Sequence, residues 1–175
     1  MDILWVGGPA AAGKTTISRL LAQKHGLLYY SVDAHARDHE RRAAAAGLHV
    51  LGNGPGDFDR RPMILEDLNA LNPKTAAVVE GAAVTPEMAG VGENAVWLMP
   101  SSGEQLARLE RRHPEGIHHG LTWGWNLIRG QLEGTAATVI TVDGQTVDQT
   151  LTAVEQAFIK LLPSAESEEA GAQGN

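Results

Sequence analysis

The chain has 175 residues, a length that fits one domain of ordinary size and excludes two full domains. With 43% hydrophobic and 20% charged residues, it has the composition of a globular protein and not of a disordered one. The formal net charge of -7 argues against nucleic acid as the main ligand, because a phosphate backbone is bound by a concentrated Lys/Arg surface.

Short apolar runs alternate with longer helix-compatible segments, the pattern of an α/β domain with a parallel sheet. The first run, Ile-Leu-Trp-Val, is continuously apolar, which is typical of a strand that helices cover on both faces. Five runs are expected to form strands, over residues 3–6, 27–32, 76–79, 95–99 and 137–142. Helices are expected over residues 15–25, 34–46, 60–71, 104–112 and 147–162.

Two segments have the composition of irregular structure. Residues 52–59 read Gly-Asn-Gly-Pro-Gly-Asp-Phe-Asp and are turn-forming throughout, so they predict a loop. Residues 163–175 place acidic side chains among Ser, Ala and Gly and predict a disordered tail. The folded domain is therefore expected to cover residues 1–162.

A flexible lid is predicted around residues 113–126. Pro114, Gly116 and Gly120 interrupt regular structure there, and arginines precede the interruption. Trp123 and Trp125 are expected to anchor the end of this segment in the core.

The chain contains no cysteine, which excludes disulfides, thiolate metal sites and a cysteine nucleophile. It begins without a basic signal-peptide region, and no apolar run approaches the roughly 18 residues of a transmembrane helix. We therefore expect a cytoplasmic protein that works without a membrane.

One motif carries specific chemistry: residues 8–15, Gly-Pro-Ala-Ala-Ala-Gly-Lys-Thr, match the phosphate-loop pattern G-x-x-x-x-G-K-[ST]. The match lies between a predicted strand and a predicted helix, as the pattern requires. Glycines let the backbone curl so that N–H groups point at phosphate oxygens, and the helix adds the positive end of its dipole. The residues expected to contact the nucleotide are Gly8, Ala10, Ala11, Ala12, Gly13, Lys14, Thr15 and Thr16.

Three side chains of this motif have separate expected roles. Lys14 is expected to reach the β- and γ-phosphates and to act in catalysis. The hydroxyl of Thr15 is expected to bind Mg²⁺, and Thr16 is expected to contact the α-phosphate. The motif therefore predicts ATP and Mg²⁺ as cofactors.

Two acids follow predicted strands, at the edge where open α/β sheets place functional groups. Asp33 is expected to accept or orient the proton of a substrate hydroxyl, and the alternative is a helix N-cap. Glu80 is expected to hold Mg²⁺ through water or to bind substrate hydroxyls, and the alternative is a solvated side chain at a turn. Further candidate substrate contacts are Arg37, Arg41, Arg60, Arg61 and Gly81.

Arg108 and Arg112 are four residues apart and share one face of a predicted helix before the lid. Arg112 is expected to stabilise the transferring phosphoryl group as a catalytic residue, and Arg108 to pack on the base of the nucleotide. The alternative is a solvated face on which Glu104 and Glu110 pair with these arginines.

The histidines carry weaker signals. His35 and His39 are four residues apart, but no third metal ligand accompanies them, so we expect surface histidines. His113, His118 and His119 fall in the predicted lid, and a catalytic or metal-binding role is the minor alternative for them.

The phosphate loop, Asp33, the Val-Val-Glu-Gly sequence at 78–81 and the arginine-bearing segment together resemble the small P-loop kinases. This group includes gluconate, shikimate and adenylate kinases and chloramphenicol phosphotransferase. The resemblance covers roughly residues 1–162 and implies a three-layer P-loop NTPase fold, an α/β fold with a five-stranded parallel sheet in the order 2-3-1-4-5 and a small lid. It also implies an acceptor site between the second strand and the lid. The chain lacks the residue pairs expected in the monophosphate site of adenylate kinase, so the acceptor stays open.

The function expected from these features is ATP-dependent transfer of the γ-phosphoryl group to a hydroxyl of a small molecule. The alternative is a nucleotide-binding regulatory module, or a slow NTPase without an acceptor, and a structural protein that does not use its loop is a third possibility. The expected partner is a small-molecule acceptor, with neither nucleic acid nor membrane. A monomer and a homodimer both stay open.

Overall fold

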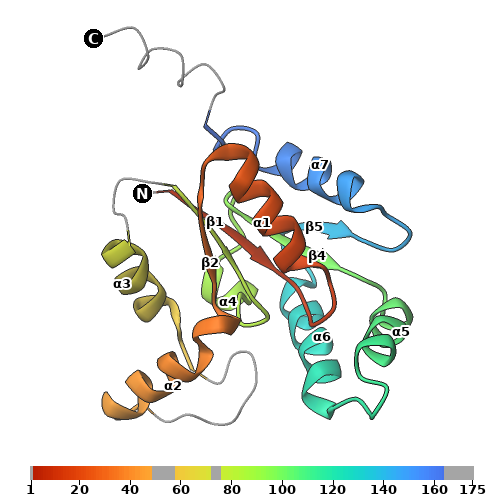
Figure 1. Ribbon diagram of the computed structural model, residues 1–175, viewed down its shortest axis with the longest axis horizontal. Helices are drawn as coiled ribbons and strands as arrows, with labels where there is room; N and C mark the ends of the chain where they lie inside the picture. Colours follow the sequence, from red (N-terminus) through yellow and green to blue (C-terminus); the bar gives the residue numbers. More distant parts are fainter. Residues whose placement is uncertain (1, 49–57, 72–75, 164–175) are drawn as a thin grey trace, which may run out of the picture.

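The computed structural model describes residues 2–48, 58–71 and 76–163. Within them lies one sheet of five parallel strands in the order β2-β3-β1-β4-β5 (Figure 1). The predicted α/β fold class and its 2-3-1-4-5 strand order are confirmed. The strands are β1 (Ile3–Gly7), β2 (Leu28–Ser31), β3 (Ala77–Glu80), β4 (Ala95–Met99) and β5 (Thr138–Thr141).

Helices connect successive strands and cover both faces of the sheet (Figure 1). The five predicted helices are present, with ends that differ by a few residues; the last one stops at Ala157 and not at residue 162. The helices are α1 (Lys14–His25), α2 (Ala36–Ala45), α3 (Arg61–Leu71), α4 (Pro86–Ala89), α5 (Ser102–Arg112), α6 (His119–Leu132) and α7 (Val147–Ala157), with the 3-10 turn η1 (Asp33–His35) before α2.

The central strand β1 is buried on both faces, as its continuous apolar run predicts. Leu4 and Val6 belong to a buried cluster with side chains of α1 and α7. Trp5 points to the opposite face and belongs to a second cluster with side chains of α3, α4 and α6. Helix layers on both sides therefore fix the strand that leads into the phosphate loop.

The register of the parallel strands brings their carboxyl ends together. Val6 near the end of β1 pairs with Glu80 at the end of β3, and Glu80 pairs with Ser31 at the end of β2. The chain leaves these three ends into the phosphate loop, the Gly81 turn and the η1 turn that carries Asp33. The functional residues predicted from three separate segments thus lie at one edge of the sheet.

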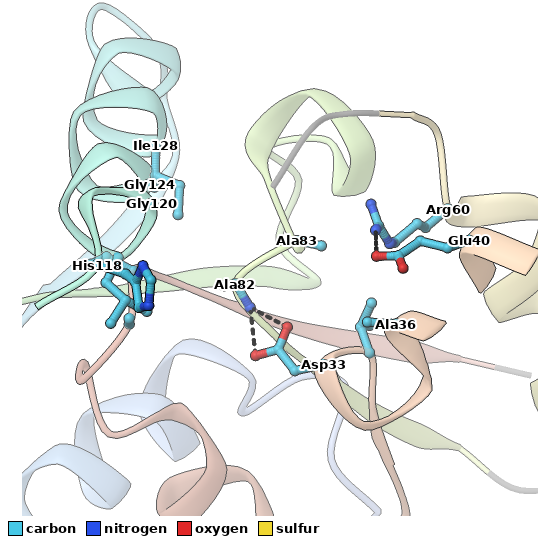
Figure 2. Close-up of a pocket in the computed structure, with 14 residues that line it drawn as sticks. Asp33, Ala36, Glu40, Arg60, Ala82, Ala83, His118, Gly120, Gly124 and Ile128 are labelled. Carbon is cyan, nitrogen blue, oxygen red and sulfur yellow. Dashed lines mark hydrogen bonds and ion pairs between the residues drawn. The ribbon is translucent and has the colours of Figure 1, made fainter. Parts of the chain in front are cut away.

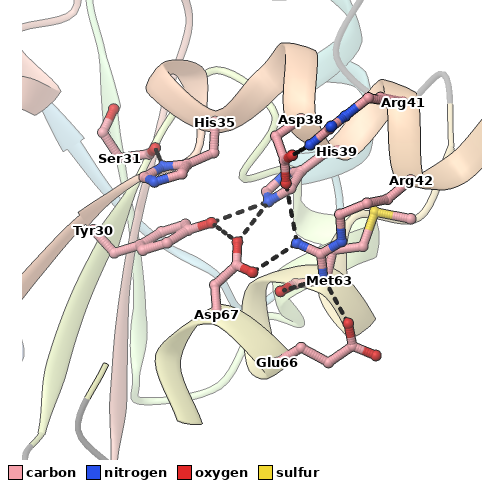
Figure 3. Close-up of polar contacts among 10 residues, drawn as sticks. All are labelled: Tyr30, Ser31, His35, Asp38, His39, Arg41, Arg42, Met63, Glu66 and Asp67. Atoms are coloured by element: carbon pink, nitrogen blue, oxygen red, sulfur yellow. Dashed lines mark hydrogen bonds and ion pairs between the residues drawn. The ribbon is translucent and has the colours of Figure 1, made fainter. Parts of the chain in front are cut away.

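A polar network joins α2 and α3 to β2 (Figure 3). The Tyr30 hydroxyl donates to Asp67 Oδ2 at 2.5 Å, and His39 Nε2 lies 3.1 Å from the same oxygen. Arg42 donates to Asp67 Oδ1 at 2.6 Å and to Glu66 at 2.5 Å. Burial and the neighbouring Asp67 raise the pKa of Tyr30, which keeps this hydroxyl a donor. The network fixes α2, and with it one wall of the site described below.

The expectation of surface histidines is wrong for His39, whose side chain is fully buried in this network. Its partners come from β2 and α3, so the local sequence does not show that His39 is buried and hydrogen-bonded. His35 is exposed, as expected, and its ring stacks on Tyr30 at a centroid distance of 4.4 Å. Within residues 2–48, 58–71 and 76–163, no cluster of three potential metal-binding side chains occurs.

The segment after α5 is more regular than the sequence predicts. Residues 113–118 form a turn and an irregular stretch, but α6 begins at His119 and includes Gly120. The helix forms despite its glycines because tertiary packing stabilises it. Ile128 is buried, and Trp125 packs against the core and donates to the Pro100 carbonyl at 2.8 Å. Trp125 is therefore an anchor as predicted, whereas Trp123 is 42% exposed and is not.

Two predicted irregular segments fall largely outside the described residues: the loop at 52–59, of which Phe58 and Asp59 are described, and the tail from residue 164 on. Across the described part of the chain, every helix is too short or too polar to cross a bilayer.

Burial lowers the pKa of His39 below its ordinary value of 6.5 and keeps the folded protein's imidazole neutral. The unfolded chain binds this proton as the pH falls through about 6.5, while the folded protein resists it. The contribution of His39 to stability is therefore complete above about pH 6.5 and is lost as the pH falls below that value.

We expect His39→Gln to show a smaller decrease in the free energy of unfolding between about pH 7.5 and 5.5 than the unaltered protein. Urea unfolding at the two pH values measures the difference. His119→Gln, on the exposed start of α6, is the matched control and should keep the full decrease. An equal decrease in His39→Gln and the unaltered protein would contradict the assignment.

Candidate active site

The loop between β1 and α1 has the curled backbone of a phosphate cradle. Gly8 has φ 137°, and a Cβ there would lie 2.3 Å from the Leu98 carbonyl oxygen, so only glycine fits. Gly13 has φ 91° and caps α1, and Ala11 has φ 63°. These conformations wrap the backbone around the N-terminus of α1, where its amide N–H groups favour an anion.

Lys14 folds back over this loop and donates from Nζ to the Pro9 carbonyl at 2.9 Å. The residue is only 6% exposed, and burial lowers its pKa; Asp33 and Glu80 act in the opposite direction, and Arg112 adds to the lowering. A buried ammonium with few protein acceptors gains from a polyanionic ligand.

Glu80 lies directly beside Thr15. The Thr15 hydroxyl donates to Glu80 Oε1 at 3.3 Å, and the Tyr29 hydroxyl donates to the same oxygen at 2.9 Å. Glu80 is 1% exposed, and its Oε2 is buried with no hydrogen-bond partner among the described residues. The alternative of a solvated glutamate is therefore wrong. A hydroxyl and a carboxylate with an unsatisfied oxygen are groups that fit Mg²⁺ or its bound water.

Asp33 lies in η1, at the end of β2, with both carboxylate oxygens held by one backbone group. Ala82 N donates to Oδ1 at 3.0 Å and to Oδ2 at 3.1 Å (Figure 2). The N-cap residues of η1 and α2 are Val32 and His35, neither with a side-chain cap bond, so the alternative of a helix cap is not observed. This clamp orients the carboxylate of Asp33 toward the hollows described next.

Two hollows meet at Asp33. The smaller, about 230 Å³, lies over the phosphate loop and is lined by residues of the loop and the start of α1, such as Lys14 and Thr15, and by Arg112 at the end of α5. The larger, about 560 Å³, lies between α2 and α6 (Figure 2). Both hollows are lined by Asp33, Ala10 and Leu121. A carboxylate at the junction is therefore within reach of ligands in both.

Arg108 binds the back of the phosphate loop. Its guanidinium donates to the carbonyls of Ala11 and Val142, each at 3.3 Å, and to Glu104 at 2.7 Å. It also lines a third hollow, of about 220 Å³, formed by α1, the loop after β5 and the start of α7. The pairing with Glu104, which the alternative predicted, is present, and the predicted contact with the base of a nucleotide stays a prediction.

Four arginines and Gly81 remain among the predicted contacts. Arg60 lines the larger hollow. Arg37 and Arg41 are exposed, Arg61 donates to the Met88 carbonyl at 3.1 Å, and these three line neither of the hollows that meet at Asp33. Gly81 does not line the larger hollow but touches Asp33: a Cβ there would lie 3.0 Å from Asp33 Oδ1. The structure therefore shows close packing at Gly81, and its contact with substrate stays a prediction.

Two residues of the larger hollow, Glu40 and His118, were not predicted as contacts. Glu40 lies on α2, seven residues after Asp33, on the same face as Ala36, which also lines the hollow. This helical spacing was the available signal. For His118, just before α6, the only signal in the sequence was its place in the predicted lid.

No family model and no curated protein sequence matches the chain. Solved structures do match. A gluconokinase from Sinorhizobium meliloti aligns with TM-score 0.54 at 17% identity, over 92% of this chain and 93% of that one. A sugar kinase from Janibacter sp. aligns with TM-score 0.54 at 18% identity, over 91% and 93%. A shikimate kinase from Acinetobacter baumannii in complex with shikimate aligns with TM-score 0.50 at 19% identity, over 91% and 94%.

The chain has the fold of the small P-loop kinases. At these identities the likeness shows the fold alone. In this P-loop kinase fold, the cradle and the two hollows lie outside the carboxyl ends of the strands, where open α/β sheets bind ligands.

Gly81→Ala should destabilise the protein, because its Cβ would lie 2.9 Å from the Cβ of the buried Val32 as well as against Asp33. Overpacking of this kind costs about 1–3 kcal/mol of unfolding free energy. Urea unfolding measures the loss. Gly130→Ala, where the added Cβ meets nothing within 4 Å inside α6, should be neutral or stabilising. Equal stability of Gly81→Ala and the unaltered protein would show that the close packing is misplaced.

Proposed function

We propose that the chain is a phosphotransferase that moves the γ-phosphoryl group of ATP to a hydroxyl of a small molecule. The position of Asp33 carries the proposal, because this carboxylate lines both the hollow over the phosphate loop and the larger hollow beside it. A donor in the first and an acceptor in the second would meet at Asp33.

The residues over the phosphate loop would bind the donor. Backbone N–H groups of residue 8 and residues 10–15 would hold the phosphates, with Lys14 on the β- and γ-phosphates and Thr16 near the α-phosphate. Arg112 lines the same hollow and would stabilise the charge of the transferring group. Arg108 would border the base, in the hollow formed with the start of α7.

Thr15 and Glu80 are the residues that would hold magnesium, the hydroxyl directly and the carboxylate through water. Bound Mg²⁺ would neutralise charge on the β- and γ-phosphates. Tyr29 keeps the Glu80 carboxylate in place through its bond to Oε1.

Asp33 would accept the proton of the acceptor hydroxyl. As the acceptor oxygen forms its bond to the γ-phosphorus, the bond from that phosphorus to the β–γ bridging oxygen breaks, and ADP leaves with the bonding electrons. The hydroxyl proton passes to the carboxylate, which the Ala82 amide holds in position.

The segment 113–126 would close over both ligands. It contains the start of α6, and its Leu121 lines both hollows, so a movement of this segment changes both sites together. The alternative function, a regulatory module or slow NTPase, needs no second ligand, so it does not account for a hollow of about 560 Å³ beside the phosphate loop.

Asp33→Asn should reduce acceptor-dependent ADP formation by at least about a hundredfold, because the amide cannot take up the proton. Its affinity for ATP should stay nearly unchanged. A coupled ADP assay with a panel of polyols, sugars, nucleosides and antibiotics, beside calorimetry with ATP and Mg²⁺, measures both quantities.

Asp2→Asn is the matched control, since Asp2 is exposed at the opposite end of the sheet. If no acceptor increases ADP formation, and Asp33→Asn leaves the rate of ATP hydrolysis intact, the chain is the slow NTPase and not a kinase.

A further inference from the structure

The far end of the larger hollow carries a cation that already has a carboxylate partner. Arg60 Nη2 lies 3.6 Å from Glu40 Oε1 (Figure 2), and the guanidinium lies over the ring of Phe58, 4.0 Å from its centroid. The Arg60 side chain is only 6% exposed, and that of Glu40 is 33% exposed. A ligand carboxylate at this end would have to compete with Glu40 for Arg60.

The charges at the two ends of the hollow are arranged differently. Asp33 lies at the phosphate end, where Lys14 and Arg112 line the adjoining hollow. Glu40 and Arg60 lie at the other end, and their charges cancel. Apart from His118, the remaining described residues of the lining carry no ionisable side chain. Counted over the described residues, the end that would receive the body of an acceptor therefore presents no net charge.

The walls between these ends are apolar, and many of their side chains are small. Ala36 lies on α2, Ala82 and Ala83 follow β3, and Gly124 and Ile128 lie on α6. Alanine and glycine leave room for a ligand ring or chain. Their surfaces favour apolar contacts and offer no partner for a charged group.

We propose that the acceptor is uncharged: a hydroxyl compound with an apolar face and without carboxylate, phosphate or ammonium group. This inference rests on the proposed function only in taking the larger hollow as the acceptor site. The Glu40–Arg60 pair is the specificity device, because it gives the far end hydrogen-bonding groups while cancelling its charge.

Matched ligands that differ at one functional group, and through it in charge, test this inference. D-sorbitol, D-gluconate and D-glucamine share a six-carbon polyol chain and end in a neutral, an anionic and a cationic group. Methyl shikimate and shikimate form a second, cyclic pair. Ligand-observed NMR titrations at pH 7.5, with a non-hydrolysable ATP analogue and Mg²⁺ present, give each Kd without any turnover.

The unaltered protein should bind the neutral member of each set roughly tenfold or more tightly than its charged counterparts. Glu40→Gln keeps the shape of the side chain but removes its charge, so it should shift the ratio roughly tenfold toward the carboxylate. Glu66→Gln is the matched control, because Glu66 pairs with Arg42 on the exposed side of the α2–α3 network. It should leave the ratio unchanged.

Tighter binding of gluconate, shikimate or glucamine by the unaltered protein overturns the inference, and this arm stands even if Glu40→Gln does not fold. A Glu40→Gln protein with an unchanged ratio, or without measurable carboxylate binding, also overturns it. The proposed function fails separately: the charge preference would be present while no neutral ligand supports ADP formation from ATP.

Discussion

The buried ammonium of Lys14 is the constraint on which the site depends. It lies among Asp33, Glu80 and Arg112, and burial lowers its pKa while the two carboxylates act against that effect. The cation can stay there only because the loop curls to present the Pro9 carbonyl and because acids stand at the ends of two neighbouring strands. A bound polyphosphate would give the Lys14 ammonium further anionic acceptors beside the Pro9 carbonyl.

The core determines where these partners lie. Parallel pairing aligns Val6, Glu80 and Ser31, so the loop after β1 and the acids after β2 and β3 leave the sheet side by side. On the β2 side, the buried His39 of α2 lies within hydrogen-bond distance of Tyr30 and Asp67, and these contacts hold α2. Asp33 and Glu40 belong to the same continuous helical stretch, which links the stability of the polar network to the geometry of the larger hollow.

The phosphate loop could be predicted because its determinants are local: glycines, a lysine and a threonine at fixed spacing after an apolar strand. The strand order was predicted from the resemblance to the small P-loop kinases. Asp33 and Glu80 were predicted because they stand at the carboxyl ends of predicted strands. The pairing of Glu40 with Arg60 could not be predicted, since it depends on how two distant segments pack. The helix α6 was missed because glycines weaken its local propensity, while the packing that outweighs them is tertiary.

Isothermal titration of ATP with Mg²⁺ into the unaltered protein and into Lys14→Ala measures whether the buried ammonium binds a polyphosphate. We expect saturable one-site binding by the unaltered protein, and binding by Lys14→Ala that is at least roughly tenfold weaker, because a charge-assisted contact to phosphate is lost. Lys160→Ala, at an exposed pair with Glu93, should bind like the unaltered protein. No binding by the unaltered protein, or equal binding by Lys14→Ala, would contradict the account.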